Sequence, residues 1–522
     1  MRSRIAHTPA WLVASVLAAI YLVVDPPSAD LAAQTYRTGL YEHAGFVVFD
    51  LGWYGGHHNP SYSILFPPLA AAIGPRVVGA LAAVLAAWAF ERLVTEHDGA
   101  GARPAALWFA TATMVSLITG RLTFALGVAL ALCAVLALSR GRLVWCGIAG
   151  AVAALASPVA VAFLALVLAA WGITRKRYLA AAALLAVTLA PAAALSYLFP
   201  EGGSFPFVWS AFVPTLAGTL LLIAVLWRSA PPMLRLGLAF YAVLLVVSAA
   251  LDTPMGGNAV RLGALFGGPI AALVLLPAGR GRALALLALP LLYWQVSTPV
   301  DDVWRAASDQ SIHASYYDGM LRFLHARQAA EGPFRIEIPF TDNHWESARV
   351  APTVPLARGW ERQLDRKVNG LFYDDEPFTP ERYQAWLADN AVRYVALAGA
   401  PIDYSAAEEA ALVRRRPSFL REVWHDAHWR IFAVRGATPL AGGGAKVTRM
   451  DADRVDLTVP RAGDYVVRVR FTPYWRALED GACVAPARGD WTTVHAARPG
   501  VVRLRASFSL GRARATTARC TS

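Results

Sequence analysis

The sequence predicts a multi-span α-helical membrane protein with an extracytoplasmic C-terminal region that combines an α/β module and a β-sandwich. Of its 522 residues, 56% are hydrophobic and only 16% are charged, which is more apolar surface than a soluble fold needs. From Ala10 to Val296 the apolar residues come in runs of about 15 to 22, near the ~20 residues that cross a bilayer. From Ser297 onward the sequence is that of an ordinary globular protein.

About eleven of these apolar runs are expected to span the membrane. The runs at 143–173 could form one long tilted helix, but their flanking charges favour a tight hairpin that turns at Ser157-Pro158. The expected spans are 10–24, 75–95, 104–119, 122–139, 143–156, 158–173, 178–197, 206–227, 234–251, 260–277 and 283–297.

Basic residues fall in alternate short loops between the expected spans, and this predicts the orientation in the membrane. By the positive-inside bias the N-terminus is cytoplasmic, so an odd number of spans leaves residues 298–522 and the long first loop at 25–74 outside. We therefore expect a multi-pass protein of a bacterial plasma membrane. The basic groups are Arg2 and Arg4, Arg92 and Arg103, Arg140 and Arg142, Arg175 to Arg177, Arg228 and Arg235, and Arg280 and Arg282.

The alternative for residues 1–33 is a cleaved signal peptide, because the first apolar run is short and is followed by Ala32 and Ala33. The further apolar segments and the alternation of loop charge favour a retained anchor. The net charge of +12 comes mostly from the arginines of the inner loops, so no nucleic-acid partner is needed. The sequence does not indicate an oligomeric state.

The four cysteines agree with this topology. Cys133 and Cys146 lie in expected spans, where a thiol packs as a small apolar group. Cys483 and Cys520 are the two cysteines of the C-terminal region, and in the oxidising environment outside a bacterial plasma membrane we expect them to form a disulfide.

The C-terminal region is expected to contain two modules. Residues 298–435 alternate strand signals, such as "FRIEIPF" at 334–340, with helix starts, and predict an α/β module. Thr379 before Pro380 marks one helix start, and Ser405 with Glu408 has the spacing of a capping box. Residues 436–522 alternate apolar and charged side chains, as in "YVVRVRF" at 465–471, and predict a β-sandwich. No P-loop, dinucleotide fingerprint or nucleophile elbow is present, which argues against soluble-enzyme chemistry.

The stretch "FDLGWYGGHHNPSYSILFPP" at 49–68 contains the first candidate site. Aromatic side chains around a carboxylate shield it partly from water, and this raises its proton affinity. Such a carboxylate can serve as a general base toward a hydroxyl. Asp50 is the first candidate and Glu42 the second. The structural alternative is that Asp50 caps a short interfacial helix near Gly52, within an aromatic belt.

The same loop contains groups that could bind a substrate. We expect a folded interfacial loop in which Tyr54, His57 and His58 contact a lipid headgroup or a polar acceptor. Together with His43 and Asp50, the histidines have the ligand types for a divalent metal, but adjacent histidines rarely bind one ion because their side chains diverge. The "HDAH" run at 425–428 leads directly into a strand, so it is a weaker metal candidate.

Two arginines stand at the predicted outer ends of spans. Arg121 and Arg261 could clamp a phosphate bidentately, as recognition of an anionic lipid headgroup requires. The alternative is snorkelling, in which the charged end only reaches the interface. Asp252 and Asn258 lie in the same loop as Arg261, where they could pair with it or bind an acceptor.

Taken together, the arrangement resembles the GT-C superfamily of membrane glycosyltransferases, most closely its YfhO-type and 6-pyruvoyl-tetrahydropterin synthase-related bacterial branches. The resemblance loosely covers nearly the whole chain. The segments that resemble these branches are "WYGGHHNPSYSILFPPL" at 53–69, "NGLFY" at 369–373 with "AVRYVAL" at 391–397, and "VRVRFTPYWRALEDGACV" at 467–484.

The resemblance implies a transferase that moves a sugar from a polyprenyl-phosphate donor to an envelope glycan, lipid or protein. A carboxylate of the first outer loop would be the base, and Asp50 matches that position best. The paired acidic motif of many such enzymes is absent, which leaves metal use open. Two alternatives remain: a secondary transporter, although no internal repeat is evident, and a non-catalytic envelope scaffold that binds glycan or protein. Fold analogy alone does not decide between them.

Overall fold

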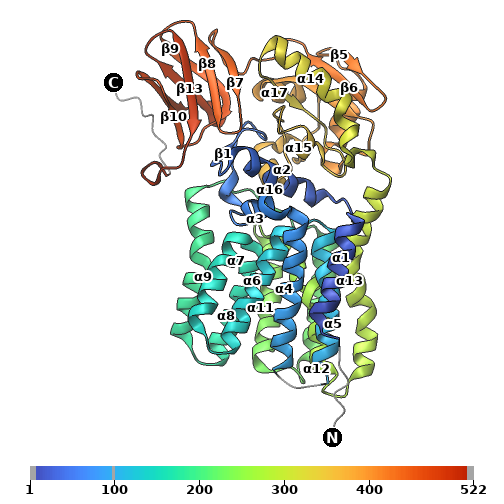
Figure 1. The fold of residues 1–522 in the computed structure, drawn as a ribbon. Coiled ribbons are helices and arrows are strands. Elements are labelled where there is room, and N and C mark those ends of the chain that lie inside the picture. Colours follow the sequence, from blue (N-terminus) through green and yellow to red (C-terminus); the bar gives the residue numbers. More distant parts are fainter. Residues whose placement is uncertain (1–7, 97–99, 514–522) are drawn as a thin grey trace. The chain divides into compact units, whose positions relative to one another are not determined.

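The computed structural model describes residues 8–96 and 100–513 (Figure 1). The chain forms two compact units. The first, here the helical unit, comprises Met1–Gln34, Tyr62–Leu195 and Ser204–Trp304. The second, here the mixed unit, comprises Thr35–Ser61, Ser196–Gly203 and Arg305–Ser522. The division differs from the expected one, because residues 35–61 of the first long loop belong with the C-terminal region.

All eleven apolar segments that the sequence predicts as spans form helices. Among the described residues, seven helices are long and apolar enough to cross a membrane, or up to eight if the first two helices, bent by 80°, count as one span. The multi-span helical fold is therefore confirmed, with fewer full-length spans than expected. The helices are α1 (Ala10–Val24), α2 (Ala29–Ala44), α3 (Phe66–Ile73), α4 (Pro75–Thr95), α5 (Ala102–Ile118), α6 (Leu122–Ser139), α7 (Leu143–Ala156), α8 (Pro158–Thr174), α9 (Tyr178–Leu198), α10 (Trp209–Leu226), α11 (Pro232–Ala250), α12 (Val260–Leu275) and α13 (Gly281–Ala307).

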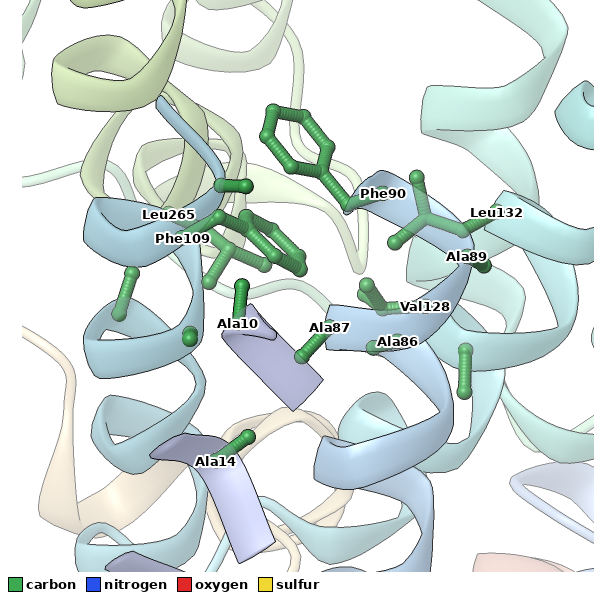
Figure 2. Close-up of a cluster of buried hydrophobic side chains, with 14 of the residues drawn as sticks. Ala10, Ala14, Ala86, Ala87, Ala89, Phe90, Phe109, Val128, Leu132 and Leu265 are labelled. Carbon is green, nitrogen blue, oxygen red and sulfur yellow. The ribbon is translucent and has the colours of Figure 1, made fainter. Parts of the chain in front are cut away.

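Small side chains let the helices of the helical unit pack closely. Figure 2 shows Ala10 and Ala14 of α1 lying in one cluster with Ala86 and Ala87 of α4. Alanine lets helix backbones approach each other, which matters in lipid because the hydrophobic effect does not drive helices together there. Larger rings fill the remaining space, as in the cluster's stacked pair of phenylalanines, Phe90 and Phe109, whose centroids are 4.3 Å apart.

The predicted break within 143–173 is present. Helices α7 and α8 are separate, and the backbone is extended at Ser157 between them. The Ser157 hydroxyl accepts a hydrogen bond from the backbone N–H of Ala160, and Pro158 occupies the first helical position. A capping serine followed by proline is a strong helix start, so these residues end one helix and begin the next.

The α/β module of the mixed unit is built on a four-stranded sheet with the strand order β3-β4-β6-β5. Strand β3 is parallel to β4, and the other pairs are antiparallel. The strand expected at 334–340 is present as the shorter β3. The elements of the module are α14 (Asp318–Glu331), β3 (Arg335–Glu337), α15 (Glu346–Arg349), α16 (Arg362–Val368), α17 (Pro380–Asp389), β4 (Val392–Ala398), α18 (Ala407–Arg414), β5 (Leu420–His425) and β6 (Trp429–Val434).

The β-sandwich consists of a sheet β10-β13-β8-β7 and a sheet β11-β12-β9. Along β9, Tyr465, Val467 and Val469 are buried, as the alternation predicts. Together with side chains such as Leu457 and Leu504 they form a common core. The strands are β7 (Lys446–Met450), β8 (Arg454–Val459), β9 (Gly463–Arg470), β10 (Trp475–Ala477), β11 (Ala482–Pro486), β12 (Trp491–Ala496) and β13 (Gly500–Ala506).

One predicted helix cap is confirmed and one is wrong. The Thr379 hydroxyl caps α17 by accepting from the backbone N–H of Arg382. Ser405 does not form a capping box with Glu408. Asp403 caps the short helical turn instead and accepts from the Ser405 N–H and hydroxyl. In a capping box the Glu408 side chain would accept from the Ser405 N–H. The Asp403 carboxylate accepts from that N–H instead.

Two further expectations concern the end of the helical region and the cysteines. The boundary expected at residue 298 falls inside α13, which continues to Ala307. Cys133 and Cys146 are free thiols on helices of the helical unit, as expected. Cys483 lies on β11, but Cys520 lies outside the described residues, so the pairing of Cys483 with Cys520 stays a prediction.

Candidate functional site

The loop that contains Asp50 folds as a small β-hairpin. Strand β1 (Phe49–Asp50) pairs with β2 (His57–His58), with Asp50 opposite His57. The expected interfacial helix near Gly52 is therefore wrong. The backbone turns through positive φ angles at Tyr54 (60°), Gly55 (75°) and Gly56 (127°), so the Gly-Gly pair provides conformations that side chains resist.

The hairpin joins the two modules of the mixed unit. On the sandwich side, the Leu51 N–H donates to Ala452 O at 2.8 Å and the Arg470 N–H donates to Gly55 O at 2.7 Å. On the α/β side, the Leu356 N–H donates to Gly52 O at 2.9 Å. Phe49 and Leu51 belong to the hydrophobic core of the sandwich. The hairpin is thus an internal part of this unit, held by main-chain hydrogen bonds to both modules.

Replacing Gly56 by alanine should destabilise the mixed unit by about 2 kcal/mol. A Cβ at this position would lie 2.2 Å from the Phe49 ring, and the backbone φ of 127° disfavours any side chain. The measurement is the melting temperature of the full-length protein in detergent. Gly39→Ala is the matched control, since Gly39 lies in α2 with no atom near the added Cβ. An equal melting temperature for both variants would contradict this account of the hairpin.

Asp50 lies at the centre of a buried polar group. Its side chain is 0% exposed. One carboxylate oxygen accepts from the Tyr36 hydroxyl at 2.7 Å, and the other accepts from the Gly52 N–H at 3.2 Å. The Nδ1 atom of His57 lies 3.8 Å from the carboxylate. Burial raises the pKa of Asp50, although the charge of His57 and the hydrogen bonds from Tyr36 and Gly52 oppose the rise. A carboxylate with a raised pKa is a stronger base.

The two adjacent histidines point to different partners. His57 stacks against Trp53, with ring centroids 5.5 Å apart, and neither ring nitrogen of His57 has a hydrogen-bond partner. His58 faces Glu201 instead, with its Nδ1 2.7 Å from the carboxylate, and its Nε2 lies 2.9 Å from Thr472 Oγ1. Burial alone would raise the pKa of Glu201, but the hydrogen bond and charge of His58 outweigh burial and lower it.

The metal candidates do not converge. Within residues 8–96 and 100–513, no group of three or more His, Cys, Asp or Glu side chains is arranged to hold a metal ion. His43 and Glu42 are exposed on α2, and His43 Nδ1 faces Gly39 O of the same helix. In the "HDAH" run, Asp426 accepts from the backbone N–H groups of His428 and Trp429, so it shapes a turn.

The helical unit contains a second candidate site around Arg121 and Arg261. Arg121 immediately precedes α6, and its Nε lies 3.0 Å from a carboxylate oxygen of Asp30. Arg261 is the second residue of α12, and its guanidinium carbon lies 5.4 Å from the centroid of the Phe124 ring. The charges of Arg121 and Asp30 act directly on Arg261, so the structure brings the two predicted arginines into one cluster.

Tyr62 completes this arginine cluster. Its hydroxyl is hydrogen-bonded with Arg261 and also accepts from Thr123 Oγ1 at 3.1 Å. Two guanidinium groups against one carboxylate leave a net charge of about +1, and both arginines stand at helix N-termini, where the macrodipole adds positive potential. The arrangement can bind an anion.

Two other predicted residues have structural contacts. The Asn258 amide donates to Pro254 O at 3.1 Å, within its own loop. The Tyr54 hydroxyl accepts from the Glu361 N–H at 2.9 Å and donates to Gly359 O in the α/β module. Asp252 is exposed. Arg261 contacts Tyr62 and Phe124 instead.

Sequence reasoning missed the partners that define both sites. Tyr36 and Glu201 contact Asp50 and His58, and Asp30 and Tyr62 contact the two arginines. Tyr36 lies fourteen residues before Asp50, and the only available signal was its position on a polar helix next to the first apolar segment. Glu201 is 143 residues from His58, and nothing in the sequence indicates that pair.

Comparison with known proteins gives structural neighbours only. No family model matches the sequence, and no curated protein is significantly similar to it. The arabinofuranosyltransferase AftD from Mycobacteria is 16% identical, with a TM-score of 0.49 over 87% of this chain and 41% of AftD. ArnT from Cupriavidus metallidurans is 14% identical, with a TM-score of 0.40 over 81% of this chain and 98% of ArnT.

The chain spans less than half the length of AftD. Because both TM-scores are below 0.5, neither likeness is evidence for a shared activity. The residues of the two candidate sites have to support a function by themselves.

Proposed function

We propose that this chain is a membrane glycosyltransferase of the GT-C type that transfers a sugar from a polyprenyl-phosphate donor to an envelope acceptor. The observation that carries the proposal is the convergence of Arg121 and Arg261 with Tyr62 in a unit made of apolar helices. Like charges repel strongly where water is scarce, and Asp30 balances only one of the two guanidinium groups, so a further anion would stabilise the cluster.

The ligand proposed for this cluster is the phosphate of a lipid. Arginine presents a planar fork that matches phosphate oxygens, and two such forks hold a tetrahedral anion from two sides. The Tyr62 hydroxyl adds a neutral donor. Asp30 balances one guanidinium, so the free site has a net charge of about +1, suited to one singly charged phosphodiester.

Asp50 is the proposed general base. Its raised pKa favours proton uptake from an acceptor hydroxyl, and Tyr36 and the Gly52 N–H fix the orientation of the carboxylate. His57 lies 3.8 Å from the carboxylate, and neither of its ring nitrogens has a hydrogen-bond partner. In this proposal the acceptor hydroxyl approaches the carboxylate from the side of His57.

Binding of polyprenyl phosphate tests the arginine cluster. Full-length protein in nanodiscs should bind polyprenyl phosphate in preference to the uncharged polyprenol. Each of Arg121→Gln and Arg261→Gln should weaken phosphate-lipid binding about tenfold or more, because each removes a charge-assisted contact of about 1.5 to 3 kcal/mol. Arg282→Gln is the control, since Arg282 is an exposed arginine at the start of α13.

Equal binding of the phosphate and the alcohol by the unmodified protein would contradict the proposal. So would a loss of binding in Arg282→Gln as large as that in the two cluster variants. The melting temperature of each variant is measured alongside, so that unfolding is not mistaken for loss of the site.

A non-catalytic envelope scaffold is the second candidate, and the burial of Asp50 favours it. The carboxylate is 0% exposed and already has two hydrogen-bond donors, which is also how a purely structural aspartate is held. A scaffold would bind the lipid phosphate without transferring any sugar. Binding combined with an absence of transfer therefore distinguishes the two candidates.

A further inference from the structure

A buried arginine without an acidic partner lies at the junction of the two modules of the mixed unit. Arg335 on β3 is 0% exposed. Its terminal nitrogens donate to Asn390 O at 2.6 Å and to Arg468 O at 2.7 Å, while its Nε has no hydrogen-bond partner. Within the part of the chain that the structure describes, no carboxylate lies within salt-bridge distance of this side chain. An uncompensated buried charge is costly.

Two more arginines converge on the same place. The guanidinium carbons of Arg335, Arg468 and Arg470 lie 5.8, 5.6 and 4.5 Å from the ring centroid of Trp491. Burial, followed by the charges of Arg470 and Arg468, lowers the pKa of Arg335 to about 9. Since guanidinium groups stay protonated in proteins, this lowering reflects first the cost of burying the Arg335 charge and second the repulsion from the two neighbouring cations.

The carboxylates at this junction compensate only part of the positive charge. Asp389 Oδ1 contacts Arg468 and accepts from Trp491 Nε1 at 3.2 Å. Asp490 lies 4.0 Å from Arg470, but its side chain is 91% exposed. The charge of Glu201 also acts on Arg470, but Glu201 is already paired with His58. Three guanidinium groups therefore face one close carboxylate, one solvated carboxylate and one carboxylate that is paired elsewhere, so the junction has an excess of positive charge.

We propose that this junction binds an oxyanion, either the carboxylate of an acidic sugar or a phosphate ester. Arg468 and Arg470, with side chains 25% and 14% exposed, would contact the anion, and the buried charge of Arg335 beneath them would add to the positive potential. A bound oxyanion would neutralise the excess charge. Because the hairpin residue Gly55 lies against both Arg335 and Trp491, the anion would bind beside the element that joins the two modules.

The site is independent of the proposed transferase activity, and its ligand class follows from its own residues. The oxygens of a carboxylate lie in one plane and those of a phosphate form a tetrahedron. A guanidinium fork recognises a pair of oxygens in either group. Trp491 is 1% exposed, so it does not offer a face on which a neutral sugar could stack. The geometry favours a charged group over a neutral hexose.

The test is anion titration of the full-length protein in detergent at constant ionic strength. Inorganic phosphate and glucuronate are the probes and glucose is the neutral comparison, with the melting temperature as readout. We expect at least one of the two anions to raise the melting temperature while glucose does not. Arg468→Gln and Arg470→Gln should each weaken the apparent affinity about tenfold. Arg476→Gln, an exposed arginine on β10, should behave like the unmodified protein.

A response to phosphate alone would assign a phosphate ester, and a response to glucuronate alone would assign an acidic sugar. The site is ruled out if neither anion acts differently from glucose, or if the Arg468→Gln and Arg470→Gln variants titrate like the control. The titration is repeated in the Arg121→Gln/Arg261→Gln background, so that phosphate bound by the helical unit does not contribute. Failure of this inference and failure of the proposed function are thereby separate results.

Discussion

Replacing Arg358 by methionine should lower the melting temperature of the mixed unit by roughly 10 °C. The Arg358 guanidinium lies inside the α/β module, with its side chain 1% exposed. It contacts Asp365 at 2.7 Å and Glu409 at 3.4 Å. Its guanidinium carbon also lies 4.0 Å and 3.8 Å from the ring centroids of Phe340 and Phe372.

The size of the effect follows from what the substitution leaves behind. Methionine fills the space between the two rings but leaves Asp365 and Glu409 buried without a cation. Breaking a buried ion pair from one side costs about 3 to 5 kcal/mol, and each kcal/mol lowers the melting temperature of a unit of this size by about 2 to 4 °C. Glu337 adds to the cost, because burial raises its pKa and neither of its oxygens has a hydrogen-bond partner.

Two comparison variants make this prediction specific. Arg414→Met changes an exposed arginine in the last turn of α18 and should leave the melting temperature nearly unchanged. Adding Asp365→Asn to Arg358→Met should recover part of the loss, because it removes the stranded carboxylate. If Arg358→Met melts at the same temperature as Arg414→Met, the ion pairs of Arg358 do not stabilise the module as described.

Asp50→Asn should reduce sugar transfer by about 10² to 10⁴-fold, the range that a general base contributes. Asparagine has nearly the same shape and can still accept one hydrogen bond from Tyr36, but it cannot take up a proton. The protein should therefore remain folded, with polyprenyl-phosphate binding unchanged. The measurement is the turnover rate of the purified full-length protein, with the melting temperature as a check on folding.

Glu42→Gln provides the discriminating comparison. Glu42 is the other carboxylate considered as a base, and its side chain is exposed on α2. We expect Glu42→Gln to keep most of the activity. The base would be reassigned if Glu42→Gln lost transfer while Asp50→Asn kept it.

The pH dependence has a definite sign. Asp50 acts as a base only when deprotonated, so turnover should rise as the pH increases through its pKa. Burial places that pKa above the ordinary value for aspartate. The rise should therefore occur at a higher pH than an exposed aspartate would give, and it should be absent from the residual activity of Asp50→Asn.

The helices and most strands were predictable from local pattern. The residues of an apolar run of about 20 positions, or of a strict alternation as in 465–471, are enough to predict its secondary structure. The Ser157-Pro158 break was predictable for the same reason, because capping and backbone restriction act over three or four residues. The two-residue strands at Phe49–Asp50 and His57–His58 are too short to show any period.

The environment of the candidate site was not predictable, because its partners are distant in sequence. Gly55 accepts from Arg470, and Gly52 accepts from Leu356. A loop after the first span that mixes polar and aromatic residues predicts a membrane-surface loop, whereas the structure forms an internal hairpin of the mixed unit. Arg121 and Arg261 were each predictable as unusual cations, but their convergence depends on the packing of α6 and α12, two helices that are far apart in the sequence.

The central claim is that the arginine cluster serves sugar transfer from a lipid phosphate. Its most direct test measures transfer by purified full-length protein from a panel of polyprenyl-phosphate-linked sugars, with and without Arg121→Gln/Arg261→Gln. We predict turnover by the unmodified protein with at least one donor, and its loss in a double variant that melts at the same temperature. Turnover that persists undiminished in the folded double variant would contradict the claim.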